Sequence, residues 1–159
     1  MVGLAGTAEK FFVCCAINEL VLQVVVGFGY FLSCLASSVQ VVLALGPALI
    51  IPLMLFGGFF LNTASIPVYL DWLKYLSWFK YGNAALMINQ WTGVEDIACP
   101  VPVNDTSVPC IRTGEQVLVK FGFDEETLWF NVVCLIILAV AFRALAFLAL
   151  LVKTRRRRN

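Results

Sequence analysis

Three long apolar runs constrain this chain more than any other feature of its sequence. They extend over residues 11–36, 39–61 and 128–152. A helix rises 1.5 Å per residue, so about 20 apolar residues cross the ~30 Å hydrocarbon core of a bilayer. Each run is long enough for one crossing. The sequence therefore predicts an all-α, polytopic membrane protein with three transmembrane helices.

The composition agrees with this class and excludes several functions. Of the 159 residues, 61% are hydrophobic and 13% are charged, whereas about a quarter of the residues of a soluble domain are charged. The chain has no histidine, which removes the commonest general base and metal ligand. It also lacks the Gly-Lys-Ser/Thr of a phosphate-binding loop. We therefore expect this chain to bind no cofactor and no nucleic acid, and not to be an enzyme by itself. We also expect no signal peptide, since no basic segment precedes the first run.

The middle run contains several residues that disturb a helix: Gly46, Pro47, Pro52, Gly57 and Gly58. Proline in a membrane helix frees carbonyl groups that neighbouring helices or water must satisfy, so we expect this helix to face protein or a cavity. One face carries Pro47, Ile51 and Leu55, with Met54 beside it. This face either lines a hydrophobic cavity or packs against another helix.

Phe59 and Phe60 end the middle run just before Asn62. Adjacent aromatic residues at the end of a span are typical of the aromatic belt at a membrane interface. Periodicity alone favours a belt for this pair over a gate.

The next segment resumes at Pro67 with a helical pattern. Aromatic and aliphatic side chains recur at i, i+3, i+4, i+7 and i+10: Tyr69, Trp72, Leu73, Leu76 and Phe79. Asp71 and Lys74 share the opposite face, so the pattern predicts an amphipathic helix suited to the membrane interface. It either anchors the chain at the interface or forms a re-entrant segment that supports a gate, and the sequence leaves both open.

Charge and loop motifs predict the orientation. Five of the eleven basic residues lie in the last seven positions, which places the C-terminus in the cytosol. Residues 62–127 are then extracytoplasmic, where glycosylation of the sequon at Asn104 can occur. A disulfide between Cys99 and Cys110 is favoured there over two free thiols, and would stabilise the loop by about 3 kcal/mol.

Two charged residues lie inside predicted spans, Glu19 in the first and Arg143 in the third. An intramembrane charge is a functional hypothesis by default, although both side chains can reach toward the membrane faces. Because their depths differ, we do not expect a direct pair. The four cysteines within the spans are interpreted as small buried apolar residues: Cys14, Cys15, Cys34 and Cys134.

Several segments of the sequence together resemble one protein family. The run GGFFLNTASIPVYLDWLKYLSWFKYGNAALMINQW at 57–91 resembles the G subfamily of ABC transporters, in particular the White-type half-transporters of arthropods that move eye-pigment precursors. Further matching pieces are MVGL at the start, FGYFLSC, GPALIIP, the loop with the sequon, and FRALAFLAL. The chain departs from that pattern at Ala84, where an acidic residue is usual, and at Glu19, where a neutral residue is more usual.

The resemblance implies the C-terminal part of an ABC-2 type transmembrane domain, with a re-entrant segment between its last two helices. ATP and Mg²⁺ would be bound by a nucleotide-binding domain that these 159 residues do not contain. By position, the resemblance makes Phe59 and Phe60 a gate and places Pro47, Ile51 and Met54 in the substrate cavity. This reverses the interpretation of the phenylalanine pair as belt residues.

The resemblance also implies partners and a location. The partners are membrane lipid, a second half-transporter in a homo- or heterodimer, and small planar substrates such as purines, pteridines or tryptophan derivatives. The location is a pigment-granule or other vesicle membrane, or the plasma membrane. A non-transporting membrane scaffold with a disulfide-closed external loop remains the alternative, and the lack of clustered polar residues makes a membrane enzyme the weakest hypothesis.

Overall fold

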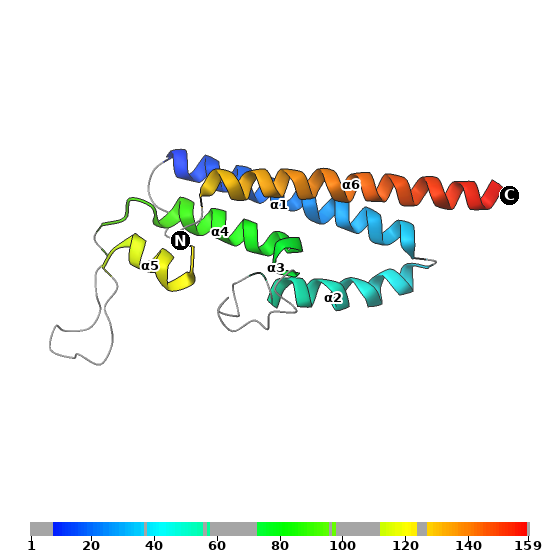
Figure 1. Ribbon diagram of the computed structural model, residues 1–159, viewed down its shortest axis with the longest axis horizontal. Helices are drawn as coiled ribbons and strands as arrows, with labels where there is room; N and C mark the ends of the chain where they lie inside the picture. Colours follow the sequence, from blue (N-terminus) through cyan, green and yellow to red (C-terminus); the bar gives the residue numbers. More distant parts are fainter. Residues whose placement is uncertain are drawn as a thin grey trace.

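The computed structural model describes residues 8–36, 38–55, 57, 73–95, 97, 112–123 and 127–158. All regular structure within these ranges is helical. The helices are α1 (Ala8–Leu35), α2 (Val39–Leu55), α3 (Leu73–Leu76), α4 (Trp78–Trp91), α5 (Gly114–Phe121) and α6 (Leu128–Arg158). Figure 1 shows α1, α2, α4 and α6 lying roughly along one common direction. The predicted all-α class is confirmed for the described part of the chain.

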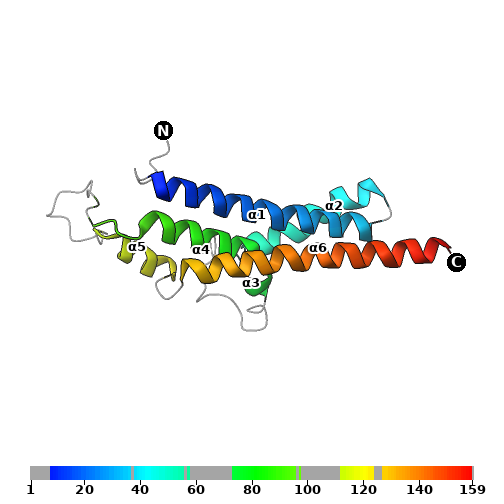
Figure 2. The ribbon, with the colours of Figure 1, turned by 90° about the horizontal axis from the view of Figure 1, so that it is seen from above.

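The two longest helices, α1 and α6, form the spine of the molecule. Each has 28 residues in a stretch long and apolar enough to cross a membrane, with mean hydropathies of 2.1 and 2.8. They lie side by side in both views (Figures 1 and 2). Gly27 permits this contact, because a Cβ atom there would lie 3.2 Å from the Cβ of Phe142. Small residues let membrane helices approach closely in this way.

The bounds of these two helices differ slightly from the predicted spans. α1 begins three residues earlier than predicted, at Ala8, and α6 continues through the basic residues to Arg158. Arginine and lysine are good helix formers, so the polar end of α6 extends the helix without extending the membrane-crossing part.

The short helix α2 is the least enclosed of the apolar helices. It has 17 residues, with Pro47 and Pro52 in its interior, and Leu53 is its one buried residue. At 1.5 Å per residue it is about 26 Å long, slightly less than the hydrocarbon core of a bilayer. The predicted run continued to residue 61, but residues 58–72 lie outside the described ranges, so a third crossing stays a prediction.

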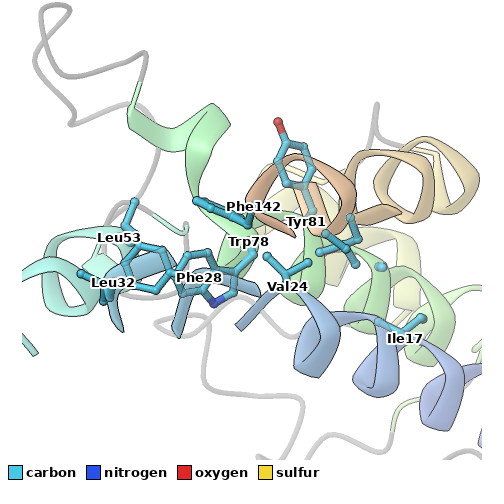
Figure 3. Packing of buried hydrophobic residues seen from close by; sticks show 11 residues of the cluster. Ile17, Val24, Phe28, Leu32, Leu53, Trp78, Tyr81 and Phe142 are labelled. Atoms are coloured by element: carbon cyan, nitrogen blue, oxygen red, sulfur yellow. The ribbon is translucent and has the colours of Figure 1, made fainter. Parts of the chain in front are cut away.

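The core lies where α1, α4 and α6 meet. Trp78 is fully buried, and its ring lies 5.1 Å from the ring of Phe28 and 6.0 Å from that of Phe142, measured between centroids. Leu53 joins this cluster from the end of α2 (Figure 3). An aromatic residue of the segment interpreted as interfacial is therefore a central core residue.

The predicted aromatic helix is not continuous. Leu73 and Leu76 lie on α3, whereas Phe79 lies on α4. Between them Ser77 has an extended backbone, with φ −80° and ψ 112°. The prediction of one continuous helix is therefore wrong. The break lets Trp78 enter the core while Tyr75 and Leu76 stay exposed.

A helix that the sequence interpretation missed, α5, covers the outer part of α4. Thr113 caps its N-terminus, since its side chain accepts a hydrogen bond from the backbone N–H of Gln116. The side chain of Gln116 in turn accepts from the N–H of Arg112 at 2.9 Å. Buried Leu118 and the neighbouring Phe123 pack against Ala84 of α4. The Thr-x-x-Gln spacing of a capping box was visible in the sequence and could have predicted α5.

Candidate functional site

The end of α2 meets the break between α3 and α4 at a buried contact, which we call the Ser77 junction and which comprises Leu53, Gly57, Ser77 and Phe79. The hydroxyl of Ser77 donates to the carbonyl oxygen of Leu53 at 2.7 Å. Both residues are buried. The last carbonyls of a helix have no partner within the helix, so this hydroxyl satisfies a group at the end of α2 that would otherwise be unpaired.

Gly57 brings the chain directly onto α4 at the same junction. A Cβ atom at this position would lie 2.6 Å from the Cβ of Phe79 and 3.3 Å from the backbone nitrogen of Lys80. Only glycine allows this approach without a shift of one of the two segments. The N–H of Gly57 donates to the carbonyl of Met54 at 3.2 Å, which continues the turn beyond α2. The end of α2 is thus fixed to the start of α4 by one hydrogen bond and one close backbone contact.

The residues predicted to line a cavity share one side of α2. Pro47 and Ile51 are exposed, and Met54 is partly buried. Their spacing of four and three residues puts them on one helical face. This face is largely exposed in the part of the chain that the structure describes.

The remaining predicted site residues lie outside the described ranges. They are the gate pair, the two loop cysteines and the glycosylation site: Phe59, Phe60, Cys99, Cys110 and Asn104. Of the cysteines predicted to be buried within spans, Cys15 is exposed, while Cys14, Cys34 and Cys134 are partly buried. That prediction is therefore wrong for Cys15 in the single chain, because it lies on an outer face of α1.

A polar link joins the two charged residues of the membrane-crossing helices. The guanidinium of Arg143 donates to the side-chain oxygen of Gln23. The side-chain nitrogen of Gln23 donates to the carboxylate of Glu19 at 2.6 Å. We call these three residues the Gln23 link. It places a positive and a negative group on either side of an amide, which lowers the cost of holding both charges at membrane depth.

Sequence reasoning treated Glu19 and Arg143 as separate side chains and missed Gln23. The spacing of Glu19 and Gln23, four residues apart on one helix, was the available signal. The contact with Arg143 could not be found in this way, because it depends on the rotation of α6 about its own axis relative to α1.

At each end of the helix bundle, a lysine side chain binds carbonyl groups at the end of a neighbouring helix. At one end the ammonium of Lys153 on α6 donates to the carbonyls of Cys34 and Ala36, both at 3.1 Å. At the other end the ammonium of Lys10 on α1 donates to the carbonyl of Thr92, just after α4, at 2.7 Å. Cations stabilise helix C-termini, where the carbonyl groups are unpaired and the helix dipole is negative.

Within the described ranges, no three histidine, cysteine, aspartate or glutamate side chains come together in a way that could hold a metal ion. The end of α2, a helix with one buried residue, contacts a well-packed unit of α1, α4 and α6 at the Ser77 junction.

Comparison with known proteins agrees with this architecture. Residues 1–91 match the family model described as ABC-2 type transporter. The chain is 46% identical to the white protein of Drosophila melanogaster over 99% of its own length and 23% of the fly protein. It is also 32% identical to the scarlet protein of Drosophila melanogaster, over 98% of this chain and 23% of the relative.

A similar match is found outside the insects. The chain is 32% identical to ABC transporter G family member 1 of Dictyostelium discoideum, over 94% of this chain and 19% of that protein. The chain therefore spans about a quarter or less of the length of these relatives. Together the family match over residues 1–91 and the similarity over nearly the whole chain show that this protein belongs to the ABC-2 type transporter family, as a White-like member of its G subfamily.

Proposed function

We propose that this chain is the C-terminal part of the transmembrane domain of an ATP-driven half-transporter. In this proposal spans at about 11–36, 39–61 and 128–152 cross the membrane, and residues 62–127 form an outer region with a re-entrant element. The observation that carries it is the 46% identity to the white protein over nearly the whole chain. The connection between α1 and α2 supports antiparallel spans, because only residues 36–38 separate the two helices.

The proposed mechanism is alternating access in a dimer. ATP and Mg²⁺ act at a nucleotide-binding domain outside these 159 residues, and the α2 helices of two halves enclose the cavity. Pro47, Ile51 and Met54 supply its apolar wall. The exposed apolar face of α2 supports this, because it is available for contact with a second half.

The proposed gate is the pair Phe59 and Phe60. Apolar side chains from both halves can close a pore by excluding water and reopen it when the helices separate. Support comes from Gly57, which is fixed against Phe79 and precedes Phe59 by two residues. A movement of α4 would therefore reach the gate through a very short piece of backbone.

The proposed substrates are small planar molecules of the pigment-precursor type, such as purines, pteridines or tryptophan derivatives. A flat ring system suits a narrow apolar cavity between two facing helices. The proposed partner is a second half-transporter, identical or related. The proposed location is a pigment-granule or other vesicle membrane or the plasma membrane, with the C-terminus in the cytosol.

The base of the outer loop supports the proposed disulfide. The N–H of Ile97 donates to the carbonyl of Arg112 at 3.0 Å, so the two sides of the loop are adjacent there. Cys99 and Cys110 each lie two residues further into the loop from this contact, counted along the sequence. We propose that they form a disulfide that closes the loop around a glycan on Asn104.

A chimera tests the proposed function. Residues 1–159 would replace the homologous quarter of the fruit-fly white protein, which would be produced with its partner half in membrane vesicles. We expect uptake of labelled purine, pteridine or tryptophan derivative that depends on ATP. The control is the same chimera with its ATP site inactivated. A chimera that inserts and dimerises normally but transports none of the three would contradict the proposal.

A further inference from the structure

The charged residues in the segments at one end of the molecule are all basic. The C-terminus of α1, the N-terminus of α2 and the C-terminal part of α6 lie at this end (Figures 1 and 2). No aspartate or glutamate occurs between residues 20 and 70 or after residue 126, whereas Lys153 and Arg155 to Arg158 are all basic. None of the segments that form this end therefore supplies a carboxylate to neutralise it.

A groove leads from the basic end along the seam between α1 and α6. It consists of two adjoining hollows of about 420 and 390 Å³, which share Ser33, Cys34 and Leu150. The hollow further from the basic end is mainly apolar and includes Tyr30 and Phe147, with the one charged side chain in its lining, Arg143, engaged by Gln23. The hollow at the end of the seam adds Lys153 and Thr154. The groove is thus mainly apolar between Arg143 and its mouth, and cationic at the mouth, where Lys153 lies.

The cation at the mouth has a fixed position. The ammonium of Lys153 is held by the carbonyls of Cys34 and Ala36. An ammonium group has three N–H donors, so these two bonds leave one donor and the positive charge for an external anion. Arg155 follows Lys153 by two residues on α6 and is exposed. Its planar guanidinium suits a phosphate.

We propose that this groove binds an anionic phospholipid. The phosphate and carboxylate of a headgroup such as phosphatidylserine lie at Lys153 and Arg155, and an acyl chain lies along Phe147 and Leu150. Between Phe147 and Lys153, α6 rises about 9 Å. This length accommodates the part of an acyl chain that is next to the headgroup. The proposal rests on the proposed cytosolic position of the C-terminus, because anionic lipids are concentrated in the cytoplasmic leaflet.

A lipid fits both parts of the groove at once. An acidic protein surface would neutralise Lys153 and Arg155. It would not contact Phe147, which is 61% exposed and lies further along the seam toward the membrane interior. Free phosphate would likewise contact only the mouth. The combination of a cationic mouth and an apolar seam within a membrane-crossing helix pair favours a ligand that is both charged and lipidic.

Native mass spectrometry of the purified chain in detergent tests the proposal. Dioleoyl phosphatidylserine and dioleoyl phosphatidylcholine would be titrated separately, and the retained lipid counted. We expect tighter retention of the serine lipid, and about a fivefold loss of that preference in Arg155→Gln, since each basic residue near an anionic surface contributes about that factor. The matched control is Lys120→Gln, which removes an exposed cation from α5 near the opposite end.

A second pair of variants tests the groove itself. Leu150→Trp fills the seam and should reduce retention of the serine lipid, whereas Leu148→Trp, on an exposed part of α6 outside the groove lining, should leave it unchanged. Because Arg155 and Leu150 are changed separately, a folding defect in one variant does not remove the test.

Three results would overturn the proposal. They are equal retention of the two lipids by the unchanged chain, unchanged preference in Arg155→Gln, and displacement of the lipid by glycerophosphoserine or inorganic phosphate at equal concentration. The last result would assign a phosphate site without a lipid chain. The assay involves no transport, so its failure leaves the transporter proposal standing, and failure of the chimera leaves the lipid result standing.

Discussion

Ser77 occupies a position where a serine normally caps its own helix. It precedes α4, yet its side chain makes no capping bond to that helix. Its hydroxyl donates to Leu53 of α2 instead. A residue that could have stabilised one helix locally is therefore bonded to a residue of another helix, 24 positions away in the sequence.

Replacing Ser77 by alanine should weaken the fold. The carbonyl of Leu53 would remain buried without its donor, which costs about 1–2 kcal/mol. The free energy of unfolding can be measured by titrating the purified chain from mild detergent into SDS and following helicity. Ser33→Ala, at an exposed position of α1, is the matched control. Equal unfolding midpoints for the two variants would show that the bond is unimportant.

Gln23 has the corresponding role between α1 and α6. Gln23→Leu should separate Glu19 from Arg143 and reduce the free energy of unfolding by about 1 kcal/mol, as for other polar contacts between membrane helices. Gln40→Leu removes an exposed amide from α2 and should have little effect. If Gln23→Leu is as stable as the unchanged chain in the same SDS titration, the link is not a stabilising contact.

Among the helices, α2 stands apart from the others. The unit of α1, α4 and α6 shares the aromatic core, whereas α2 contributes one buried residue to it, Leu53, with Ile50 packed against the cluster. Two prolines and an open apolar face give α2 few fixed contacts. We therefore expect motion during transport to be concentrated in α2, with the Ser77 junction as its attachment.

The proposed gate at the end of this helix can be tested directly. Phe59→Ala with Phe60→Ala should let water and substrate leak between the two sides, because small side chains cannot exclude water from the pore. In the assembled transporter, ATP hydrolysis should continue while net uptake falls, so the ratio of substrate moved to ATP hydrolysed is the measurement.

The matched control is the double variant Phe11→Ala with Phe12→Ala. These phenylalanines are also adjacent and exposed, but they lie near the start of α1. The control should keep the normal ratio. An unchanged ratio in the Phe59 and Phe60 variant would favour the belt interpretation.

The sequence predicts the helices better than it predicts where they break. Apolar length correctly indicated α1 and α6, because crossing a bilayer requires a long uninterrupted run. The spacing from Leu73 to Phe79 fits one helix equally well, so periodicity could not reveal the break at Ser77. That break depends on packing of Trp78 against Phe28, a contact between distant segments that no local pattern encodes.

At the scale of the whole molecule, polarity is arranged along the long axis. Exposed Trp129 lies near the start of α6 and Lys153 near its end. The helix rises about 36 Å from one to the other, enough for a hydrocarbon core and part of its interfaces. An aromatic residue at one interface and basic residues at the other agree with the proposed orientation.

Glycosylation offers a test of that orientation. In cells or microsomes, the chain should lose apparent mass when N-glycans are removed enzymatically, and Asn104→Gln should abolish the shift. An epitope tag placed after Asn159 should react with antibody only from the cytosolic side. A protected tag, or an unchanged mass after deglycosylation of a correctly inserted chain, would contradict the proposed topology.

The two lysines that close the bundle have a consequence for how it can move. Lys153 ties α6 to the end of α1, and Lys10 ties α1 to the segment after α4. Sliding of any of these helices along its neighbour would pull an ammonium group away from its carbonyls at one end or the other. We therefore expect α1, α4 and α6 to tilt together as one unit in the proposed transport cycle, while α2 turns relative to them at the Ser77 junction.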